Sequence, residues 1–444
     1  MISQKKVWLL LKFTVALTLL WIIFLLNHRD PSNIFRYSWL DYTDADGSPE
    51  NVCNCSAVLQ GEREALEQAK LLTITKDFQK SVQIPNEYYI NAILDCRKFK
   101  SSRKYLTFPL SKEEEDFPLA YSMVVHHKVQ NFEQLLRAIY APQNIYCVHV
   151  DKKSEASVFS AISAITSCFP NVFMVSQAVS VVYAAWPRVQ ADLNCMDDLY
   201  NAKTKWKYFI NLCGQDFPLK TNLEIVRALQ SLKGSNSLES EKLPQNKQWR
   251  VSHAHQIVDG EIKPTGNIKE PPPFNLTIMS GNAYMVVNRG YIRSVLEDDR
   301  VLALIEWAKD TFSPDEFLWA TIQRLPGVPG SKRPSPKYDM TDINAIARLV
   351  KWQLHEGEVY PECQGNHVRD ICVYGAGDLQ WLLQQHHLFA NKFDTDTYPI
   401  AVYCLEKYLR HKALSYFRRI DIFSAPKNNF KRYFNSFFFF CQKK

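Results

Sequence analysis

The chain opens with one long apolar stretch. Residues 7–26 are apolar apart from Lys12 and two threonines. This length is adequate for a thin early-secretory bilayer if the Lys12 ammonium snorkels. A cleaved signal peptide is the alternative, but no small-x-small cleavage site follows Leu26. Because lysines precede the stretch, positive-inside logic predicts a cytosolic tail over residues 1–6, a transmembrane signal-anchor over 7–26 and a lumenal remainder.

Polar residues dominate positions 27–115, which we interpret as a lumenal stem with one amphipathic helix over 62–79. From residue 117 onward, short apolar runs alternate with segments of helical spacing. The pattern predicts strands over 119–127, 144–150, 171–175, 206–212 and 283–287, and helices over 131–140, 154–168, 188–200 and 223–232, the last capped by Asn222, before a helical run to residue 310. Strands that alternate with helices through short connections indicate an α/β fold with a parallel, doubly wound sheet.

The first two predicted strands end in charged and imidazole side chains. His126 and His127 close the first strand, and Asp151, Lys152 and Lys153 follow the second. In doubly wound sheets, ligands bind beyond the carboxyl ends of the strands. These residues are therefore candidates for a binding site, although ordinary polar loop residues would give the same pattern.

Composition narrows the class of protein. Asn54 and Asn275 each begin an Asn-x-Ser/Thr sequon, and the eleven cysteines suit an oxidising compartment. No CxxC or Cys/His zinc pattern occurs, so no structural metal is expected. Of the net charge of +7, residues 409–444 contribute +8 (nine Lys or Arg against one Asp), which leaves about −1 for the rest. The basic character thus belongs to the tail and does not indicate nucleic-acid binding.

The most informative local motif runs over residues 310–319. Ser313 is suited to a helix N-cap, Pro314 to the first helical position, and Glu316 to the third, where it would complete a capping box. In the alternative interpretation, Glu316 is a general base at the rim of a pocket, ionised by the helix N-terminus. Spacing alone favours the capping role, and the two roles are compatible because a carboxylate has two oxygens.

Several common sites are missing from the sequence. There is no G-x-S-x-G elbow, no Walker A loop and no GxGxxG segment. Asp-x-Asp occurs at Asp44/Asp46 and at Asp394/Asp396, but neither pair follows an apolar strand. We therefore expect neither pair to clamp a metal-bound nucleotide.

Six longer motifs resemble those of the β-1,6-N-acetylglucosaminyltransferases, and among these the core 2 type that branches mucin O-glycans. They occupy residues 117–122, 141–151, 182–184, 190–195, 313–319 and 372–379, and the resemblance extends from about residue 55 to about 410. It implies a GT-A-like, Rossmann-type domain over 116–412 without a metal-binding Asp-x-Asp, and it leaves residues 413–444 as a basic extension of unknown role.

The activity that the resemblance implies is an inverting transfer of GlcNAc from UDP-GlcNAc, in β-1,6 linkage, to the GalNAc of Galβ1-3GalNAcα-Ser/Thr. No metal cofactor is expected. The base would be Glu316, and Arg369 and Lys392 would stabilise the UDP leaving group. The resemblance implies further donor contacts at Val124, Val125, His126, Asp151, Lys152, Lys153 and Tyr183, and acceptor contacts at Glu239, Lys247, Arg250, Glu316, Lys337 and Trp352.

Two departures affect the expected acceptor site. Leu354 stands where a tyrosine is expected, so a hydroxyl donor is lost, and the stretch around Trp249 differs from the usual charged run. I-branching of poly-N-acetyllactosamine is therefore the alternative activity. An inactive glycan-binding homologue is the alternative from another class, and the presence of Glu316, Arg369 and Lys392 argues against it.

The cysteine frame of the family implies four disulfides and one free thiol at Cys213. The pairs are Cys55–Cys404, Cys96–Cys168, Cys147–Cys195 and Cys363–Cys372. Cys53 and Cys441 remain, and they could join two chains in a disulfide-linked homodimer. The resemblance also implies a single-pass type II protein of the Golgi membrane, with a lumenal catalytic domain that acts on O-glycosylated mucin-type glycoproteins.

Overall fold

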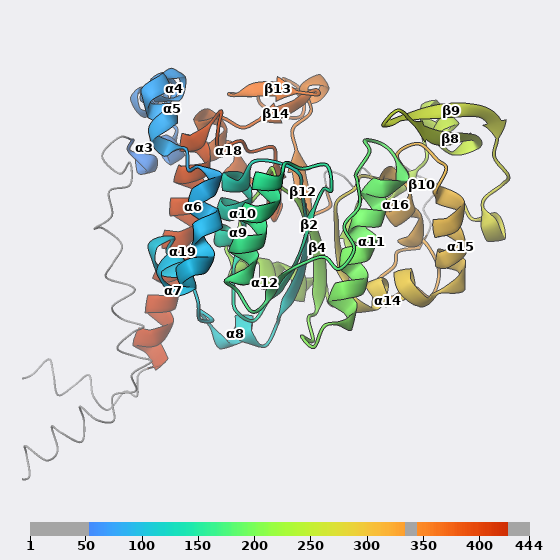
Figure 1. Cartoon of the computed structure of the whole chain (residues 1–444), viewed down its shortest axis with the longest axis horizontal. Helices are drawn as coiled ribbons and strands as arrows, with labels where there is room; N and C mark the ends of the chain where they lie inside the picture. The colour runs from blue at the N-terminus through green and yellow to red at the C-terminus, as the bar shows by residue number, and fades with distance from the viewer. Residues whose placement is uncertain (1–52, 334–343, 425–444) are drawn as a thin grey trace, which may run out of the picture. The chain divides into compact units, whose positions relative to one another are not determined.

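The computed structural model describes residues 53–333 and 344–424, with side chains to residue 418. Its centre is a six-stranded sheet with the order β3-β2-β1-β4-β11-β6 (Figure 1). The strands are β1 (Leu119–Val125), β2 (Ile145–Val150), β3 (Val172–Met174), β4 (Tyr208–Cys213), β6 (Ser237–Leu238) and β11 (Met285–Asn288). The first four pair in parallel, and β11 adds to β4 in the antiparallel direction. The predicted α/β fold with a parallel sheet is confirmed, although one side of the sheet is antiparallel.

Helices cover both faces of this sheet. Tyr121 and Met123 of β1 share one hydrophobic cluster with helices α9 (Val129–Ile139), α10 (Ala156–Ser167) and α12 (Asn222–Ser231) (Figure 1). Ala120 of β1 shares a second cluster with α11 (Trp186–Asn201), α14 (Arg289–Glu297) and α15 (Asp299–Ala308). Neighbouring residues of a strand point to opposite faces, so β1 contributes to both cores. All seven residues of β1 except Val124 are buried, as expected for a strand covered on both sides.

Smaller sheets surround the central one. β12 (Arg348–Val350), β15 (Phe389–Asn391) and β5 (Asp216–Pro218) form a three-stranded sheet, and β7 (Glu241–Lys242) pairs with β10 (Met279–Ser280). Two hairpins extend from the domain: β8 (His253–Val258) with β9 (Glu261–Ile268), and β13 (Asn366–Val368) with β14 (Ile371–Val373). The remaining short helices are α13 (Trp249–Ser252), α16 (Leu318–Ile322), α18 (Leu379–Gln384), η3 (Gln245–Lys247), η4 (Pro273–Asn275), η5 (Pro314–Glu316), η6 (Gln353–His355) and η7 (Ala376–Asp378).

The described part of the expected stem is helical and packs on the domain. Its helices are α3 (Cys55–Gln60), α4 (Arg63–Ile74), α5 (Lys76–Val82), α6 (Asn86–Ile90), η2 (Asn91–Asp95), α7 (Cys96–Ser102) and α8 (Lys112–Glu115). Val58 and Ala69 are fully buried in a third core cluster together with residues of α18 and α19 (Pro399–Ser424). The expected boundary at residue 115 therefore does not coincide with a boundary in the structure, because apolar residues on both sides of it share the same cores.

Several expected element ends shift. The predicted helix over 62–79 is two helices, because Thr75 adopts an extended conformation between them. Thr221, rather than Asn222, caps α12: its hydroxyl accepts from the Glu224 amide, and the Glu224 carboxylate accepts from the Thr221 amide. The predicted helical run to 310 is broken at Asp298, which caps α15.

The C-terminal helix crosses another expected boundary. α19 continues past residue 412, and Leu414 and Phe417 of the expected extension are buried. Within the described ranges, no helix combines the length and hydropathy that a membrane span requires. The expected anchor over 7–26 lies outside the described residues.

Four disulfides join distant parts of the chain. They are Cys55–Cys404, Cys96–Cys168, Cys147–Cys195 and Cys363–Cys372, the four pairs that the resemblance implied. Among the described residues, Cys53 and Cys213 are free, and Cys441 lies outside them. Cys55–Cys404 ties the first described helix to α19, so the chain is closed across 349 residues.

Candidate active site

Loops at the carboxyl ends of β1 and β2 carry the first group of expected site residues. Asp151 is nearly buried, and it organises the loop through both of its oxygens. Oδ1 accepts a hydrogen bond from the Lys153 amide at 2.9 Å, and Oδ2 accepts one from the Val181 amide at 3.3 Å. The Lys152 amide donates to the Val179 carbonyl at 3.2 Å. Asp151 and Lys152 thereby connect the end of β2 to the segment that precedes Tyr183.

The neighbouring end of β1 is tightly packed. Val125 belongs to the core rather than to an open surface, and its carbonyl accepts from the Asp151 amide at 2.9 Å. A Cβ atom at Gly214 would lie 2.6 Å from a Val125 methyl, so only glycine fits there. Val124 pairs with His149 and Cys213 across the sheet. The valines therefore shape the floor of the site, and His126 is the first side chain beyond it.

Two cations lie beside this floor. The β13–β14 hairpin turns at Arg369 and Asp370, which both have positive φ, and the Arg369 guanidinium lies 4.9 Å from the centre of the Tyr183 ring. The Lys392 ammonium donates to the Val368 carbonyl at 3.0 Å. Burial and the charge of Arg369 lower the pKa of Lys392, so the two cations are close enough to repel each other. An anion between them would relieve that repulsion.

Imidazole and phenol groups complete the donor side. Burial lowers the pKa of His126, and the positive charges of Lys153 and Arg369 lower it further against the opposing effect of Asp151. His126 therefore lies within electrostatic reach of both expected donor-binding loops. The Tyr183 ring is 72% exposed, which leaves one face open for a ligand.

Glu316 does not cap a helix as the motif predicted. Ser313 has a left-handed conformation and forms no side-chain cap, residues Pro314–Glu316 form a 3₁₀ turn, and α16 begins only at Leu318. The capping-box prediction is wrong because the Ser313 amide is engaged elsewhere, in a 2.7 Å hydrogen bond to the Ala184 carbonyl. This bond attaches the Glu316 turn directly to the segment that carries Tyr183.

Cations from the expected acceptor side hold the Glu316 carboxylate. Arg250 donates to Oε2 of Glu316, and the Lys247 ammonium lies 3.9 Å from the same oxygen. Among the described residues, Oε1 takes part in no hydrogen bond. The Phe312 amide donates to the Arg250 carbonyl at 3.0 Å, which fixes both segments against each other. The Glu316 carboxylate is thus partly exposed, and its partner is a cation rather than a helix N-terminus.

Of the other expected acceptor residues, Glu239 neighbours the Glu316 turn, whereas Trp352 lies beside the β13–β14 hairpin. Glu239 lies between β6 and β7, where its carbonyl would be 2.5 Å from a Cβ atom at Gly281; the Gly281 amide in turn donates to the Glu316 carbonyl at 2.7 Å. Trp352 is 40% exposed and forms a β-bridge with Ile371 of the Arg369 hairpin. Leu354, the departure noted above, is 73% exposed. Lys337 lies outside the described residues.

Three further charged residues, Arg188, Asp192 and Asp315, lie close to Glu316, and the sequence analysis assigned no role to them. Arg188 and Asp192 form a buried pair on α11 at 2.7 Å, and Arg188 also acts on Asp315. Burial raises the pKa of Asp315 to about 6, and the neighbouring Glu316 contributes in the same direction against Arg188. The i, i+4 spacing of Arg188 and Asp192 was a visible signal, but only the fold brings Asp315 to them.

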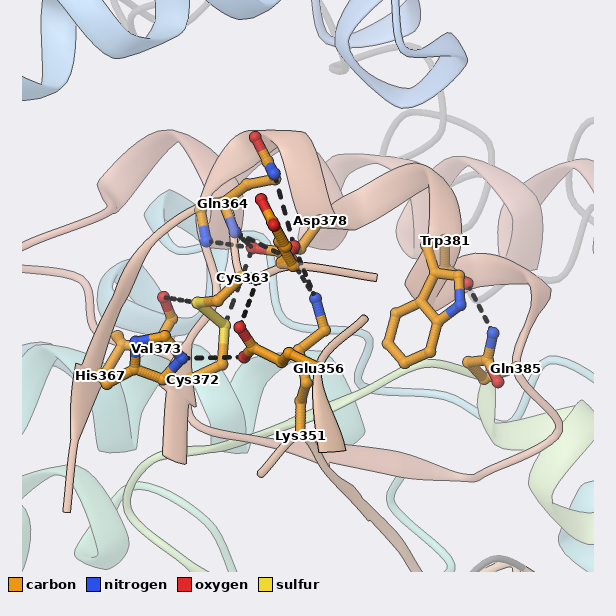
Figure 2. Close-up of polar contacts among 12 residues, drawn as sticks. Lys351, Glu356, Cys363, Gln364, His367, Cys372, Val373, Asp378, Trp381 and Gln385 are labelled. Atoms are coloured by element: carbon orange, nitrogen blue, oxygen red, sulfur yellow. Dashed lines mark hydrogen bonds and ion pairs between the residues drawn. A yellow bond between two sulfur atoms is a disulfide. The ribbon is translucent and has the colours of Figure 1, made fainter. Parts of the chain in front are cut away.

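Two groups of acidic or sulfur side chains in the described ranges bear on a possible metal site. Asp394 and Asp396 both pair with the Lys128 ammonium, at 2.6 and 3.1 Å, and Asp44/Asp46 lie outside the described residues. Glu356 lies close to the sulfurs of Cys363 and Cys372 (Figure 2). Those sulfurs are joined in a disulfide, so they are not available as thiolate ligands.

Both sequon asparagines are exposed. Asn54 caps α3 through Oδ1, which accepts from the Ala57 amide at 3.2 Å, so its amide nitrogen remains available. Asn275 ends a 3₁₀ turn on the loop that follows β9.

A doubly wound α/β sheet with a half-exposed carboxylate, paired cations and an open aromatic ring at its edge is the arrangement of a glycosyltransferase. The family model of the Core-2/I-Branching enzymes matches residues 119–383. The chain belongs to this family.

Curated relatives agree with this assignment. A human β-1,3-galactosyl-O-glycosyl-glycoprotein β-1,6-N-acetylglucosaminyltransferase is 53% identical over 375 residues, which cover 83% of this chain and 88% of the relative. The Bos taurus protein of the same name is 55% identical, with coverage of 83% and 87%, and that of Bovine herpesvirus 4 (strain V. test) is 55% identical, with coverage of 81% and 83%. The protein is therefore an enzyme of the glycosyltransferase class.

Proposed function

We propose that this enzyme transfers GlcNAc from UDP-GlcNAc, in β-1,6 linkage, to the GalNAc of Galβ1-3GalNAcα-Ser/Thr, and so forms core 2 branches on O-glycans. The names of the curated relatives support this substrate pair, since they describe a β-1,6-N-acetylglucosaminyltransferase acting on a β-1,3-galactosyl-O-glycosyl-glycoprotein. The high identity extends over the whole of the matched domain.

One observation carries the proposal: the Tyr183–Ala184 segment is contacted from two sides. Arg369 stacks over the Tyr183 ring, and the turn that leads to Glu316 is hydrogen-bonded to the Ala184 carbonyl. A cation suited to a diphosphate and a carboxylate suited to a hydroxyl thereby flank the same few residues. A transferase that joins a nucleotide-sugar to a hydroxyl needs this juxtaposition.

The chemistry follows from these groups. The 6-hydroxyl oxygen of the acceptor attacks the anomeric carbon of GlcNAc while its proton passes to Oε1 of Glu316. The bond from that carbon to UDP breaks, and its electron pair remains on the diphosphate. Arg369 and Lys392 offset the charge that develops there, which is the role of a metal in other transferases. Attack opposite the leaving group inverts the anomeric configuration.

Substrate sides follow from the same arrangement. The uridine side comprises the β1 and β2 loops with His126, Asp151, Lys152 and Lys153, below Tyr183. On the acceptor side, Lys247 and Arg250 hold Oε2 of Glu316, so that Oε1 faces the incoming hydroxyl. The exposed Trp352 ring offers a flat apolar face to sugar C–H groups.

We further propose that the enzyme works in the Golgi lumen as a single-pass type II membrane protein. The apolar segment over 7–26, the exposed sequon residues Asn54 and Asn275 and the four disulfides support a secretory location. Its acceptors would be O-glycosylated mucin-type glycoproteins. Among the described residues Cys53 has no disulfide partner and is only partly buried, which supports a disulfide-linked homodimer.

The decisive experiment is a transfer assay with UDP-GlcNAc and two acceptors, synthetic Galβ1-3GalNAc and an N-acetyllactosamine oligomer. Exclusive or strongly preferred transfer to the GalNAc 6-hydroxyl of the first acceptor is the expected result. Preferred transfer to galactose of the second would instead establish I-branching, for which the exposed Leu354 in place of a hydroxyl donor is the motivating observation. Binding of either glycan without transfer would contradict both.

A further inference from the structure

The hairpin that carries Arg369 has little apolar support of its own. Its strands are three residues each, and Asn366, Val368, Arg369 and Asp370 are all exposed. An isolated two-stranded ribbon of this size is marginally stable in water. The position of Arg369 must therefore be set by specific contacts to the rest of the domain.

Two sets of contacts fix the base of the hairpin. The Cys363–Cys372 disulfide anchors β14, and the Cys372 amide donates to the Lys351 carbonyl at 3.0 Å. Beneath it, the fully buried Lys351 ammonium pairs with Asp378 at 2.8 Å (Figure 2). These contacts hold β14 directly, and they reach β13 through its ladder with β14 and at the Asn366 carbonyl, which lies 3.8 Å from Cys363 Sγ.

A hydrogen-bonded pair of side chains holds the middle of β13. His367 Nε2 lies 2.8 Å from Glu356 Oε1, and the other oxygen of Glu356 accepts from the Cys363 amide at 3.2 Å (Figure 2). Glu356 is only 11% exposed, and its bonds to His367 and to the Cys363 amide lower its pKa despite burial, so it remains ionised. The pair therefore ties the middle of β13 to the loop 356–363 across the disulfide.

The effect of this pair reaches both cations. His367 lies on β13, two residues before Arg369 in the turn, and the turn residues Arg369 and Asp370 have positive φ, which fits only one register of the ribbon. Between His367 and Arg369, the Val368 carbonyl accepts a hydrogen bond from the Lys392 ammonium. A shift of β13 would move the guanidinium off the Tyr183 ring and remove the acceptor of Lys392 at the same time.

We propose that Glu356 and His367 are positioning residues for the transfer reaction: their hydrogen bond fixes β13 so that Arg369 and Lys392 meet the diphosphate together. The inference rests on the proposed function, because it assigns these cations to the leaving group. Neither residue touches the substrate. A misplacement of about 1 Å at a reacting group lowers rate by about 100-fold, so the pair should affect catalysis strongly and stability weakly.

The test compares His367→Ala, His367→Gln, Arg369→Ala and the double variant His367→Ala/Arg369→Ala. His367→Ala should lower kcat/KM for UDP-GlcNAc by roughly 10- to 100-fold and weaken UDP binding in calorimetry, with the acceptor KM unchanged. His367→Gln, whose amide can still donate to Glu356, should recover most of the activity. The loss in the double variant should be smaller than the product of the two single losses, since His367→Ala acts partly through Arg369 and only its effect on Lys392 remains once Arg369 is gone.

Glu358→Ala provides the matched control, since this exposed carboxylate lies two residues from Glu356 on the same loop. It should leave all parameters unchanged. If His367→Ala were unaltered while Arg369→Ala was impaired, this inference would be overturned, and the leaving-group role of Arg369 would stand. Equal effects of His367→Ala on thermal stability and on both substrates, without rescue by glutamine, would reduce the pair to a structural role. Full activity of Arg369→Ala would overturn the leaving-group role and this inference together.

Discussion

Replacement of Glu316 by glutamine is the most direct test of the proposed chemistry. The variant keeps the shape of the side chain, and its carbonyl can still accept from Arg250, which now bonds the carboxylate through Oε2. What it loses is the ability of Oε1 to take a proton from the acceptor hydroxyl.

The expected loss follows from that single change. General-base catalysis contributes about 10²- to 10⁴-fold to rate, so kcat should fall by an amount within that range. UDP affinity should be unchanged, because Arg369 on the β13–β14 hairpin and Lys392 at the end of β15 form no hydrogen bond or ion pair with Glu316 or Arg250.

The assay measures kcat and KM on the Galβ1-3GalNAc acceptor together with UDP affinity by calorimetry. Glu306→Gln is the matched control: this exposed carboxylate pairs with Lys309 at 2.5 Å ten residues earlier in the chain, and its loss should leave kcat unaltered. A Glu316→Gln enzyme within about tenfold of wild-type kcat would refute the assignment of the base. An equal loss of UDP binding would show that Glu316 acts on the donor side instead.

Three further results are expected. Lys351→Met should lower the unfolding free energy by about 3–5 kcal/mol in urea titrations, because it leaves the Asp378 carboxylate buried without its cation. Lys112→Met, which removes a fully exposed ion pair, is the control and should leave the unfolding midpoint nearly unchanged. Asp315 has a folded pKa of about 6 against its usual 3.8, so its contribution to stability is present at low pH and lost as pH rises through 6. The stabilisation by Asp315→Asn should accordingly be larger at pH 7 than at pH 4, by up to about 3 kcal/mol, and an equal effect at both would contradict the raised pKa. Transfer should persist in EDTA, and a strict requirement for added manganese would contradict the role of Arg369 and Lys392.

Much of the central sheet follows from local pattern. The apolar runs that become β1, β2 and β4 are flanked by helical spacing and short connections, and these features survive folding because both faces of the strands are buried. The sequence pattern predicted a helix start wrongly where two neighbouring residues were both suited to cap the helix. Thr221 and Asn222 are both good caps, but the Asn222 side-chain oxygen already accepts from the Asn144 side-chain amide, while its nitrogen donates to Glu114.

The site required more than spacing. The resemblance of long motifs pointed to Glu316, Arg369 and Lys392, whereas spacing alone favoured a capping role for Glu316. That role failed because a hydrogen bond from the Ser313 amide to Ala184, 129 residues earlier, holds the turn in another conformation. Long-range contacts of this kind leave no periodic trace in the sequence.

By itself, the sequence determined the alternation of buried strands and amphipathic helices, the polar ends of β1 and β2, and the two sequons on which the proposed secretory location partly rests. Each of these depends on residues close together along the chain. Tertiary structure alone decided that the described part of the stem belongs to the same cores as the sheet, that Asp315 lies beside Arg188, and that Arg369 and Glu316 flank the Tyr183–Ala184 segment. Those relations join segments more than a hundred residues apart, and only packing and burial bring them together.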